Sequence, residues 1–347
     1  MKHPREILLG SQAAGSALPV CDHYSGVEVR MRKSLQLQAE MTQEFGTCVF
    51  DVTLDCEDGA PVGGEHEHAL VVVELALQAM QRATAVPGTI APRIAVRVHP
   101  VGHPAFASDV ATIVGRAGTA LCHLMIPKVE SLADVDRAVA AVDRALTVGT
   151  CALPLHVLIE SPAAVHRAFE IASHPRVQSL SFGLMDFVSA HGGAIPASAM
   201  STGNHPQCLD QFMHPLVVRA KLEISSACHA FGKVPAHGVV TEFSDTVVLE
   251  GAARRAANEL GFTRMWSIHP NQIRPILAAF KPELREVEVA ATIIAAAARA
   301  DWAPISVKSR LHDRASYRYY WQLLERAHHT GLCLPSEVQG YFCAVPH

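Results

Sequence analysis

Eight short apolar runs alternate with helical patterns along the chain, and this alternation restricts the possible folds more than any other feature. Strands that alternate with helices pair in parallel through right-handed crossovers, so eight units predict a closed (β/α)8 TIM barrel. An open doubly wound sheet is the alternative. The predicted strands are "ALPVC" (17–21), "CVFDVTLD" (48–55), "RIAVRV" (93–98), "ALCHLMIP" (120–127), "LHVLIE" (155–160), "SLSFG" (179–183), "PAHGVV" (235–240) and "RMWSIH" (264–269). Helical patterns lie at 26–44, 65–83, 131–146, 162–173, 213–231 and 245–260.

Two further features favour the barrel and suggest where it ends. No G-x-G-x-x-G follows the first run, as it would in a dinucleotide-binding open sheet. After residue 275 the pattern changes, and "PELREVEVAATIIAAAARA" and "SRLHDRASYRYYWQLLERAHHTG" predict long helices. We therefore expect a barrel over residues 1–275 and a C-terminal helical extension over 276–347, packed on the barrel or on a neighbouring subunit.

Composition excludes several classes of function. The chain is 49% hydrophobic, but no stretch approaches the ~18 apolar residues of a membrane span. A net charge of −4 with dispersed basic residues argues against nucleic acid as a partner. The nine cysteines form no CxxC pair, which is typical of reduced thiols, and the N-terminus carries no apolar signal segment. We therefore expect a cytoplasmic protein without a membrane segment.

Charged residues gather just after the predicted strands, at the end where a parallel barrel carries its chemistry. The second strand is followed by Glu57 and Asp58. The third, fourth, fifth and sixth strands deliver Arg97, Lys128, Glu160 and Asp186 in turn. A single charge after a strand is usually a loop residue, but repetition on one rim of a closed barrel points to a shared site.

The residue types on this rim are chemically complementary. Glu160 and Asp186 could share one hard cation, and Mg²⁺ typically takes one or two protein carboxylates, with Mn²⁺ as the alternative. Arg97 offers a rigid fork for a substrate carboxylate. Glu57 and Asp58 are candidate bases, or hold metal-bound water, or orient Arg97. Such a site would bind a 2-oxo acid and stabilise an enolate.

Some rim residues have a structural explanation as well as a functional one. Lys128 is assigned to substrate binding, although a salt bridge with a rim acid would account for it. Gly183 is assigned to close approach of the backbone to a ligand, although a tight strand exit would also require glycine. A helix-capping or core histidine would look the same as a catalytic one, so His99 and His269 receive no role.

Six segments occur in an order that resembles the citrate lyase β-subunit-like proteins of the HpcH/HpaI aldolase superfamily, relatives of malyl-CoA and citramalyl-CoA lyases. They are "FDVTLDCEDGAP", "AVRVHP", "LMIPKVES", "LIESPAAVHRAFEIA", "FGLMDF" and "SIHPNQI", and the resemblance covers roughly residues 16 to 290. It implies a (β/α)8 barrel, Mg²⁺ at Glu160 and Asp186, and Arg97 on the substrate carboxylate. It also implies aldol-type carbon–carbon cleavage of a 3-hydroxyacyl thioester, in a homotrimer or homohexamer whose C-terminal segment reaches a neighbour's site.

The chain departs from the family pattern at several places. The family's "LDLED" is "LDCED" here, His99 replaces an asparagine, and the first strand lacks a basic residue. The tail "GLCLPSEVQGYFCA" also lacks the late aspartate that serves as acid or base in the acyl-CoA lyases. The sequence therefore predicts a Mg²⁺-dependent lyase of a 3-hydroxy acid or its CoA thioester. The alternatives are a free-acid aldolase, an acyl-CoA thioesterase, or a non-catalytic 2-oxo-acid-binding subunit or sensor.

Overall fold

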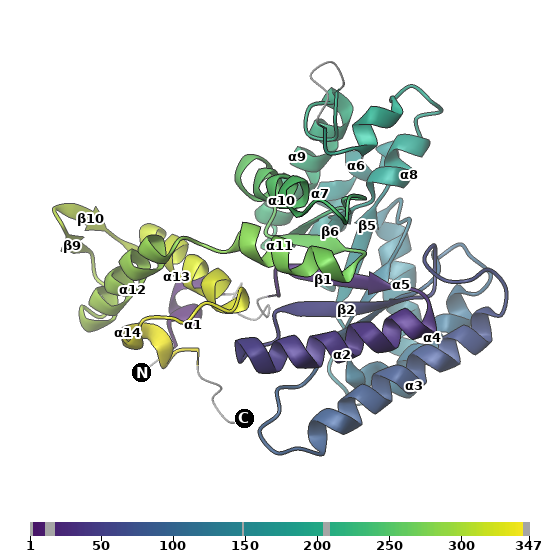
Figure 1. Cartoon of the computed structure of the whole chain (residues 1–347), viewed down its shortest axis with the longest axis horizontal. Helices are drawn as coiled ribbons and strands as arrows, with labels where there is room; N and C mark the ends of the chain where they lie inside the picture. Colours follow the sequence, from purple (N-terminus) through teal and green to yellow (C-terminus); the bar gives the residue numbers. More distant parts are fainter. Residues whose placement is uncertain (1–2, 11–17, 148, 204–208, 343–347) are drawn as a thin grey trace.

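The computed structural model describes residues 3–10, 18–147, 149–203 and 209–342. Eight parallel strands pair in sequence order, and β1 also pairs with β8, so the barrel is closed as the alternation predicts (Figure 1). The strands are β1 (Cys21–Ser25), β2 (Phe50–Asp55), β3 (Ile94–Arg97), β4 (Leu121–Ile126), β5 (Leu155–Ile159), β6 (Val177–Phe182), β7 (Val234–His237) and β8 (Arg264–Ser267).

Helices surround the barrel and bury its strands on both faces, which is why the strands read as apolar runs rather than as alternating patterns. All six residues of β2 are buried, for example. The surrounding helices are α2 (Glu28–Phe45), α3 (Glu65–Thr84), α4 (Phe106–Ala117), α5 (Leu132–Ala145), α6 (Pro162–His166), α7 (Ala168–Ser173), α8 (Leu184–Ser189), α9 (Pro215–Ala230), α10 (Thr246–Leu260) and α11 (Pro270–Phe280). Within the described residues, none of the helices combines the length and the apolar character that crossing a membrane requires.

The first strand was predicted four residues too early, at 17–21 instead of Cys21–Ser25. The strand begins at Cys21 instead of ending there, and its residues "CDHYS" are all buried. Asp22 made this segment look too polar for a buried strand, because a buried carboxylate needs a partner that the sequence does not reveal. In the structure Asp22 Oδ2 lies 2.8 Å from an Arg264 guanidinium nitrogen, and Thr53 donates a hydrogen bond of 2.7 Å to Asp22 Oδ1.

The C-terminal segment forms a second hydrophobic cluster together with the N-terminal helix, in a lobe beside the barrel (Figure 1). Helix α11 belongs to the barrel, since Ile276 and Phe280 lie in the barrel core. The lobe comprises α1 (Pro4–Leu9), α12 (Leu284–Arg299), the antiparallel pair β9 (Ile305–Val307) and β10 (Arg310–His312), α13 (Arg314–His329) and α14 (Ser336–Gln339). The start of the second predicted helix is therefore the strand β10.

The lobe meets the barrel at the end where the strands begin. His329 at the end of α13 lines a cavity of about 410 Å³ together with Arg93 and Cys122, which lie at the starts of β3 and β4. Gly331 also approaches the ring of Phe45, the last residue of α2. In this chain the described part of the lobe therefore contacts the barrel opposite the rim that carries Glu160 and Asp186.

Candidate active site

The rim residues come together as the strand order requires. Arg97 is the last residue of β3, Glu160 follows β5 directly, and Asp186 lies in the first turn of α8. Glu57 and Lys128 follow β2 and β4 within two residues of the strand ends. Carboxyl ends of parallel strands meet at one face of a barrel, so these side chains share a single surface.

Arg97 is held by a carboxylate that the sequence analysis did not single out. Its Nε donates to Asp55 Oδ1 at 2.7 Å, and a terminal nitrogen donates to Asp55 Oδ2 at 2.5 Å. Asp55 and Arg97 are direct partners in the β2–β3 register, which brings the fork and the carboxylate side by side. The other terminal nitrogen lies 3.2 Å from Glu57 Oε2. Only this second edge of the guanidinium faces away from Asp55.

Asp55 also organises the acidic loop behind it. Its two oxygens accept hydrogen bonds from the backbone N–H groups of Glu57, at 3.0 Å, and of Gly59, at 2.8 Å. A Cβ on Gly59 would lie 2.3 Å from Asp55 Oδ2, and one on Gly26 would lie 1.9 Å from the carbonyl oxygen of Gly59. The glycine after the acids is therefore required by close packing of the loop onto Asp55 and onto the loop after β1.

Lys128 places an ammonium group among the rim acids. Its Nζ lies 2.5 Å from Glu57 Oε1, 3.3 Å from Asp58 Oδ2 and 3.9 Å from Asp186 Oδ1. Burial opposes its charge, but the hydrogen bond and charge of Glu57 outweigh this effect and raise the pKa of Lys128. The Asp58 side chain is more exposed than that of Glu57, and it forms an ion pair with Lys128.

Glu160 is buried beside Asp186. Burial and the neighbouring Asp186 charge raise the pKa of Glu160 to about 8. Its Oε2 accepts a hydrogen bond of 3.2 Å from the backbone N–H of Lys128. The carboxyl group occupies space that only glycine leaves open, because a Cβ on Gly183 would lie 2.4 to 2.8 Å from Glu160 Cγ, Cδ and Oε1. Gly183 therefore makes room for Glu160, in addition to any approach to a ligand.

The two histidines without an assigned role have structural partners. His99 Nδ1 lies 2.6 Å from Asp109 Oδ2 at the start of α4. His269 is the N-cap of α11, where its Nδ1 accepts from the backbone N–H of Asn271, and its ring packs on Phe243. Helix capping and local packing account for both side chains.

An aromatic layer closes the barrel directly below the rim. Tyr24 and Trp266 pack with ring centroids 4.3 Å apart and 30° between their planes, and the Arg97 guanidinium lies 5.5 Å from the Tyr24 ring centroid. Met125, Leu158 and Ala236 complete this layer. The sequence analysis missed Tyr24 because it placed the first strand too early.

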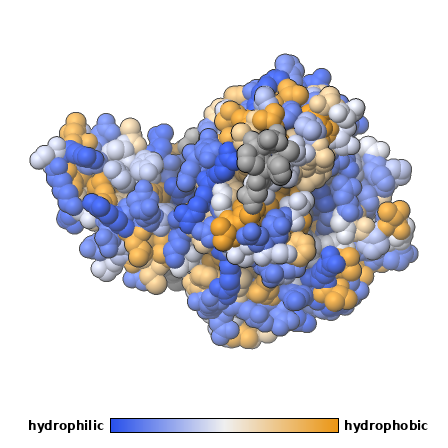
Figure 2. All heavy atoms as spheres, turned by 45° about the horizontal axis from the view of Figure 1, so that its top comes forward, coloured by the Kyte–Doolittle hydropathy of each residue, from blue (hydrophilic) through white to orange (hydrophobic). Residues whose placement is uncertain are grey.

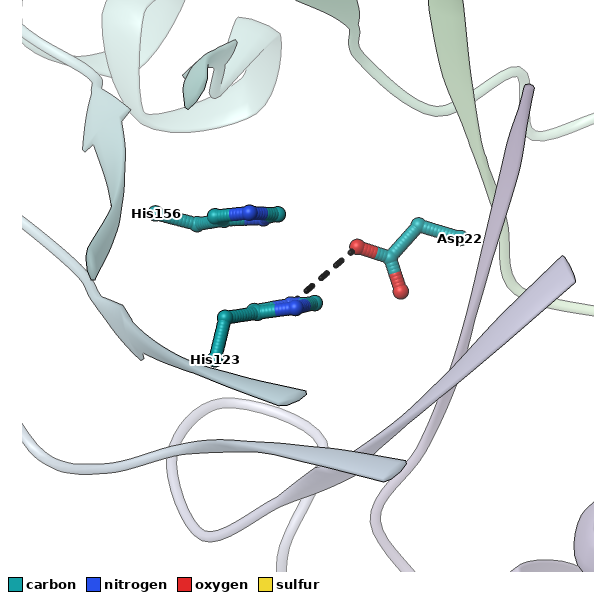
Figure 3. Close-up of side chains that lie close together, drawn as sticks. All are labelled: Asp22, His123 and His156. Carbon is teal, nitrogen blue, oxygen red and sulfur yellow. Dashed lines mark ion pairs between the residues drawn. The ribbon is translucent and has the colours of Figure 1, made fainter. Parts of the chain in front are cut away.

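Deeper in the barrel, three fully buried side chains present the atoms that transition metals prefer (Figure 3). The nitrogen and oxygen atoms of Asp22, His123 and His156 lie within 4.8 Å of one another. However, the two imidazole rings are stacked, with centroids 3.5 Å apart and 11° between their planes. Ring nitrogens bind metals in the ring plane, so the two lone pairs run side by side instead of converging. Arg264 already balances the Asp22 charge, and we assign the cluster to barrel packing.

A second buried group, formed by Asp51, Cys122 and His123, is also unsuited to a cation. Asp51 is paired with Arg93 at 2.5 Å and with Arg264 at 2.6 Å, and two guanidinium groups would repel a metal ion. Among the described residues, no group of three such ligands converges on the rim. A cation on the rim would therefore take few protein ligands and leave most of its positions to water and substrate.

Comparison with known proteins identifies the family. A family model described as HpcH/HpaI aldolase/citrate lyase matches residues 35–270. The L-malyl-CoA/β-methylmalyl-CoA lyase of Cereibacter sphaeroides is 34% identical over 235 residues, which cover 65% of this chain and 73% of the relative. The malyl-CoA/β-methylmalyl-CoA/citramalyl-CoA lyase of Chloroflexus aurantiacus is 27% identical over 58% of this chain and 61% of its own length.

Solved structures of citrate lyases are also similar to this chain. A citrate lyase from Burkholderia xenovorans LB400 is 45% identical with a TM-score of 0.75, covering 99% of this chain and 100% of that one. The citrate lyase β subunit from Mycobacterium tuberculosis, complexed with oxaloacetate and magnesium, is 21% identical with a TM-score of 0.57 over 77% of this chain and 98% of that one, a likeness of fold. The family match over residues 35–270, the closed barrel and the curated relatives show that the chain belongs to the HpcH/HpaI aldolase/citrate lyase family and is a carbon–carbon lyase.

Proposed function

We propose that the chain cleaves a 3-hydroxyacyl-CoA thioester of the malyl, citramalyl or citryl type into a 2-oxo acid and an acyl thioester, with Mg²⁺ or Mn²⁺ as cofactor. The observation that carries this proposal is that Glu160, Asp186 and Arg97 lie on the same rim of the barrel. The curated lyase at 34% identity supports the thioester as substrate class.

The residues on the rim fit a hard divalent cation. Glu160 and Asp186 supply only oxygen donors, and Gly183 leaves the space in which the Glu160 carboxyl group lies. Lys128 contacts both carboxyl groups, since its backbone N–H donates to Glu160 at 3.2 Å and its Nζ lies 3.9 Å from Asp186 Oδ1, so the two acids lie on the same part of the rim. A bound cation would polarise the 3-hydroxyl group, whose oxygen becomes the keto oxygen of the 2-oxo acid, and would favour loss of the hydroxyl proton.

Arg97 and Glu57 carry the remaining steps of the proposal. The Arg97 edge that faces away from Asp55 binds the substrate carboxylate, while Asp55 fixes the guanidinium in place. Glu57 removes the proton of the 3-hydroxyl group, and burial raises the pKa of Glu57, which makes it a better base than a solvated carboxylate. The hydroxyl-bearing carbon becomes the keto carbon of the 2-oxo acid as the carbon–carbon bond breaks. The acyl fragment keeps the electron pair as an enolate and then takes up a proton at carbon.

Asp58 is the second candidate base. Partial burial opposes its charge, but hydrogen bonding with Glu57 and the charge of Lys128 lower the pKa of Asp58, which weakens it as a base. Its greater exposure leaves it closer to solvent than Glu57. We therefore assign proton removal to Glu57 before Asp58.

The test is a substrate panel of malyl-, β-methylmalyl-, citramalyl- and citryl-CoA, with the corresponding free acids, in Mg²⁺ or in EDTA. We expect metal-dependent release of a 2-oxo acid from at least one thioester, with no release of free CoA. Free CoA without a 2-oxo acid would instead support thioester hydrolysis, the activity named for a (3S)-malyl-CoA thioesterase of C. sphaeroides that is 28% identical over half of this chain. Cleavage of a free acid alone would support an aldolase, and oxo-acid binding without turnover would support a sensor.

Replacing Gly183 by alanine is expected to lower kcat/KM by roughly 10- to 100-fold, because the added Cβ must displace the Glu160 carboxyl group. Steady-state kinetics at saturating Mg²⁺ would measure this. Gly251→Ala on α10 is the matched control, since a Cβ there meets nothing within 4 Å. Equal activity of the two variants would show that Glu160 tolerates displacement.

We also propose that copies of this chain associate as a homotrimer or homohexamer in the cytoplasm. The described surface exposes large apolar side chains, among them Met213, Val247 and Leu311, and apolar patches interrupt the hydrophilic surface in Figure 2. Because the lobe contacts the barrel opposite the rim, its described part covers no part of its own chain's rim and leaves that rim open to a neighbour. The molar mass in solution, measured by light scattering, tests the assembly, and a monomer would contradict it.

A further inference from the structure

Lys128 contacts more of the acidic rim than any simple salt bridge requires. Its ammonium group lies within 4 Å of carboxylate oxygens from Glu57, Asp58 and Asp186. Its backbone N–H donates to the Glu160 carboxylate at 3.2 Å. One residue therefore touches both proposed metal ligands and both candidate bases, and its side-chain charge has the same sign as a metal ion.

The backbone of Lys128 indicates that this placement is specified. Its φ is +51°, in the left-handed region that residues other than glycine, asparagine and aspartate seldom adopt. Lys128 follows β4 and Pro127, and its backbone conformation points its N–H at Glu160 while its side chain reaches Glu57. A lysine that only needed a surface partner would not require a disfavoured backbone conformation.

Two other roles for a lysine at the mouth of a barrel fit these contacts poorly. Attack on a 2-oxo acid to form a Schiff base needs a neutral amine, and proton donation needs an ammonium that loses its proton readily. Three surrounding carboxylates stabilise the charged form and therefore oppose both roles. What the contacts favour is a permanent positive charge.

We propose that the Lys128 ammonium is a resident cation of the rim: it holds Glu57, Asp58 and Asp186 together when no metal is bound, and it competes with the divalent cation for them. This inference rests on the proposed function, because it takes Glu160 and Asp186 as the metal ligands. Lys128 thereby sets the metal affinity of the site, keeping the cation exchangeable while the carboxylates stay in position.

Removing this charge has a defined consequence. A unit positive charge a few ångströms from a divalent cation weakens its binding, so Lys128→Met and Lys128→Gln are expected to bind Mn²⁺ roughly 10-fold more tightly than the wild type. Lys128→Arg keeps the charge and is expected to stay near the wild-type affinity. Lys281→Met is the control for net charge, since Lys281 is exposed at the end of α11 and has no contact with the rim.

The experiment titrates Mn²⁺ into each full-length protein, with free Mn²⁺ followed by electron paramagnetic resonance and without substrate. The same proteins are melted in EDTA and in excess Mn²⁺. Lys128→Met and Lys128→Gln are expected to melt lower than the wild type in EDTA, and to show a larger rise in Tm on addition of Mn²⁺. The melting curves also report whether each variant is folded.

Each outcome decides the matter. Tighter binding in both neutral variants, with Lys128→Arg and Lys281→Met near the wild type, supports the resident cation. Weaker or unchanged binding in the neutral variants, with Mn²⁺ still bound by the wild type, overturns it and leaves the proposed function standing. No Mn²⁺ binding by the wild type overturns both. A borohydride-dependent mass increase on Lys128 with a 2-oxo acid would replace the resident cation by a Schiff base.

Discussion

Glu160→Gln and Asp186→Asn are each expected to lower kcat/KM for carbon–carbon cleavage by about 1000-fold or more. A cation that polarises the substrate oxygens contributes several kcal/mol to the transition state, and each 1.36 kcal/mol is a factor of ten in rate. Both amides keep the shape of the side chain but lose the charge that binds the cation. The loss should therefore appear in Mn²⁺ affinity and in turnover together.

The fold should survive these changes. Glu160 is buried, and burial and Asp186 raise its pKa to about 8, so the neutral glutamine resembles the protonated form that the apoprotein favours. Asp186 is partly exposed, and its carboxylate makes a loose ion pair of 3.9 Å with Lys128. Glu288→Gln on the exposed face of α12 is the matched control. Variants that lose turnover but keep wild-type Mn²⁺ affinity would remove Glu160 and Asp186 from the metal site.

The barrel could be predicted because most of its strands are apolar on both faces. Seven predicted strands overlap the observed ones by three residues or more, the first overlaps β1 at Cys21 alone, and β5 begins at the predicted residue, Leu155. The bounds of β1 were predicted wrongly because the burial of Asp22 depends on Arg264, more than 200 residues away, and no local sequence pattern shows such a pair. The predicted helix after β5 also breaks at Arg167 into α6 and α7, and Ser161 caps the start of α6 by accepting a hydrogen bond from the backbone N–H of Ala164.

The candidate site could be predicted as a set of residues but not as a set of contacts. Position after a strand places Glu160, Asp186 and Arg97 on one rim, and the alternation alone implies this. Which acid holds Arg97 depends on strand register, and the register selects Asp55. The need for Gly183 likewise depends on where the Glu160 side chain turns, which only the folded chain shows. The individual roles of the rim residues remain predictions.

The histidines show a further limit of sequence analysis. Four of them, His23, His123, His156 and His237, are at most 2% exposed, and burial is the main cause that lowers the pKa of each. For His156 the pKa falls from 6.5 to about 3, through burial and then through the charge of Arg264. His123, His156 and His237 lie inside predicted strands, and His23 lies in β1, which was predicted too early. Their neutral, buried rings make the fold sensitive to acid.

The stability contributed by His156 is expected to be lost as the pH falls from about 6.5 towards 3. The unfolded chain binds a proton in this range that the folded chain does not, so acid favours unfolding, by about 2 kcal/mol at pH 5 for this residue alone. Glu160 acts in the opposite direction, because its pKa is raised in the folded chain. The change with pH in the wild type's free energy of unfolding therefore contains both contributions. The difference between the wild type and His156→Gln isolates that of His156, since the Glu160 contribution cancels.

At pH 7 His156→Gln is expected to be less stable than the wild type by about 1 to 3 kcal/mol, because it loses the stack on His123 and the contact with Gln178. At pH 5 this gap, the difference in the free energy of unfolding between the wild type and His156→Gln, should narrow by about 2 kcal/mol. Only the wild type is destabilised by keeping a neutral imidazole in its folded state. Urea unfolding followed by circular dichroism at both pH values measures the gap. The exposed His166→Gln is the control and should show no such narrowing. A gap for His156→Gln that stays constant would mean that His156 takes up a proton in the folded barrel, and that the surrounding carboxylates Asp22 and Asp51 outweigh burial and the charge of Arg264.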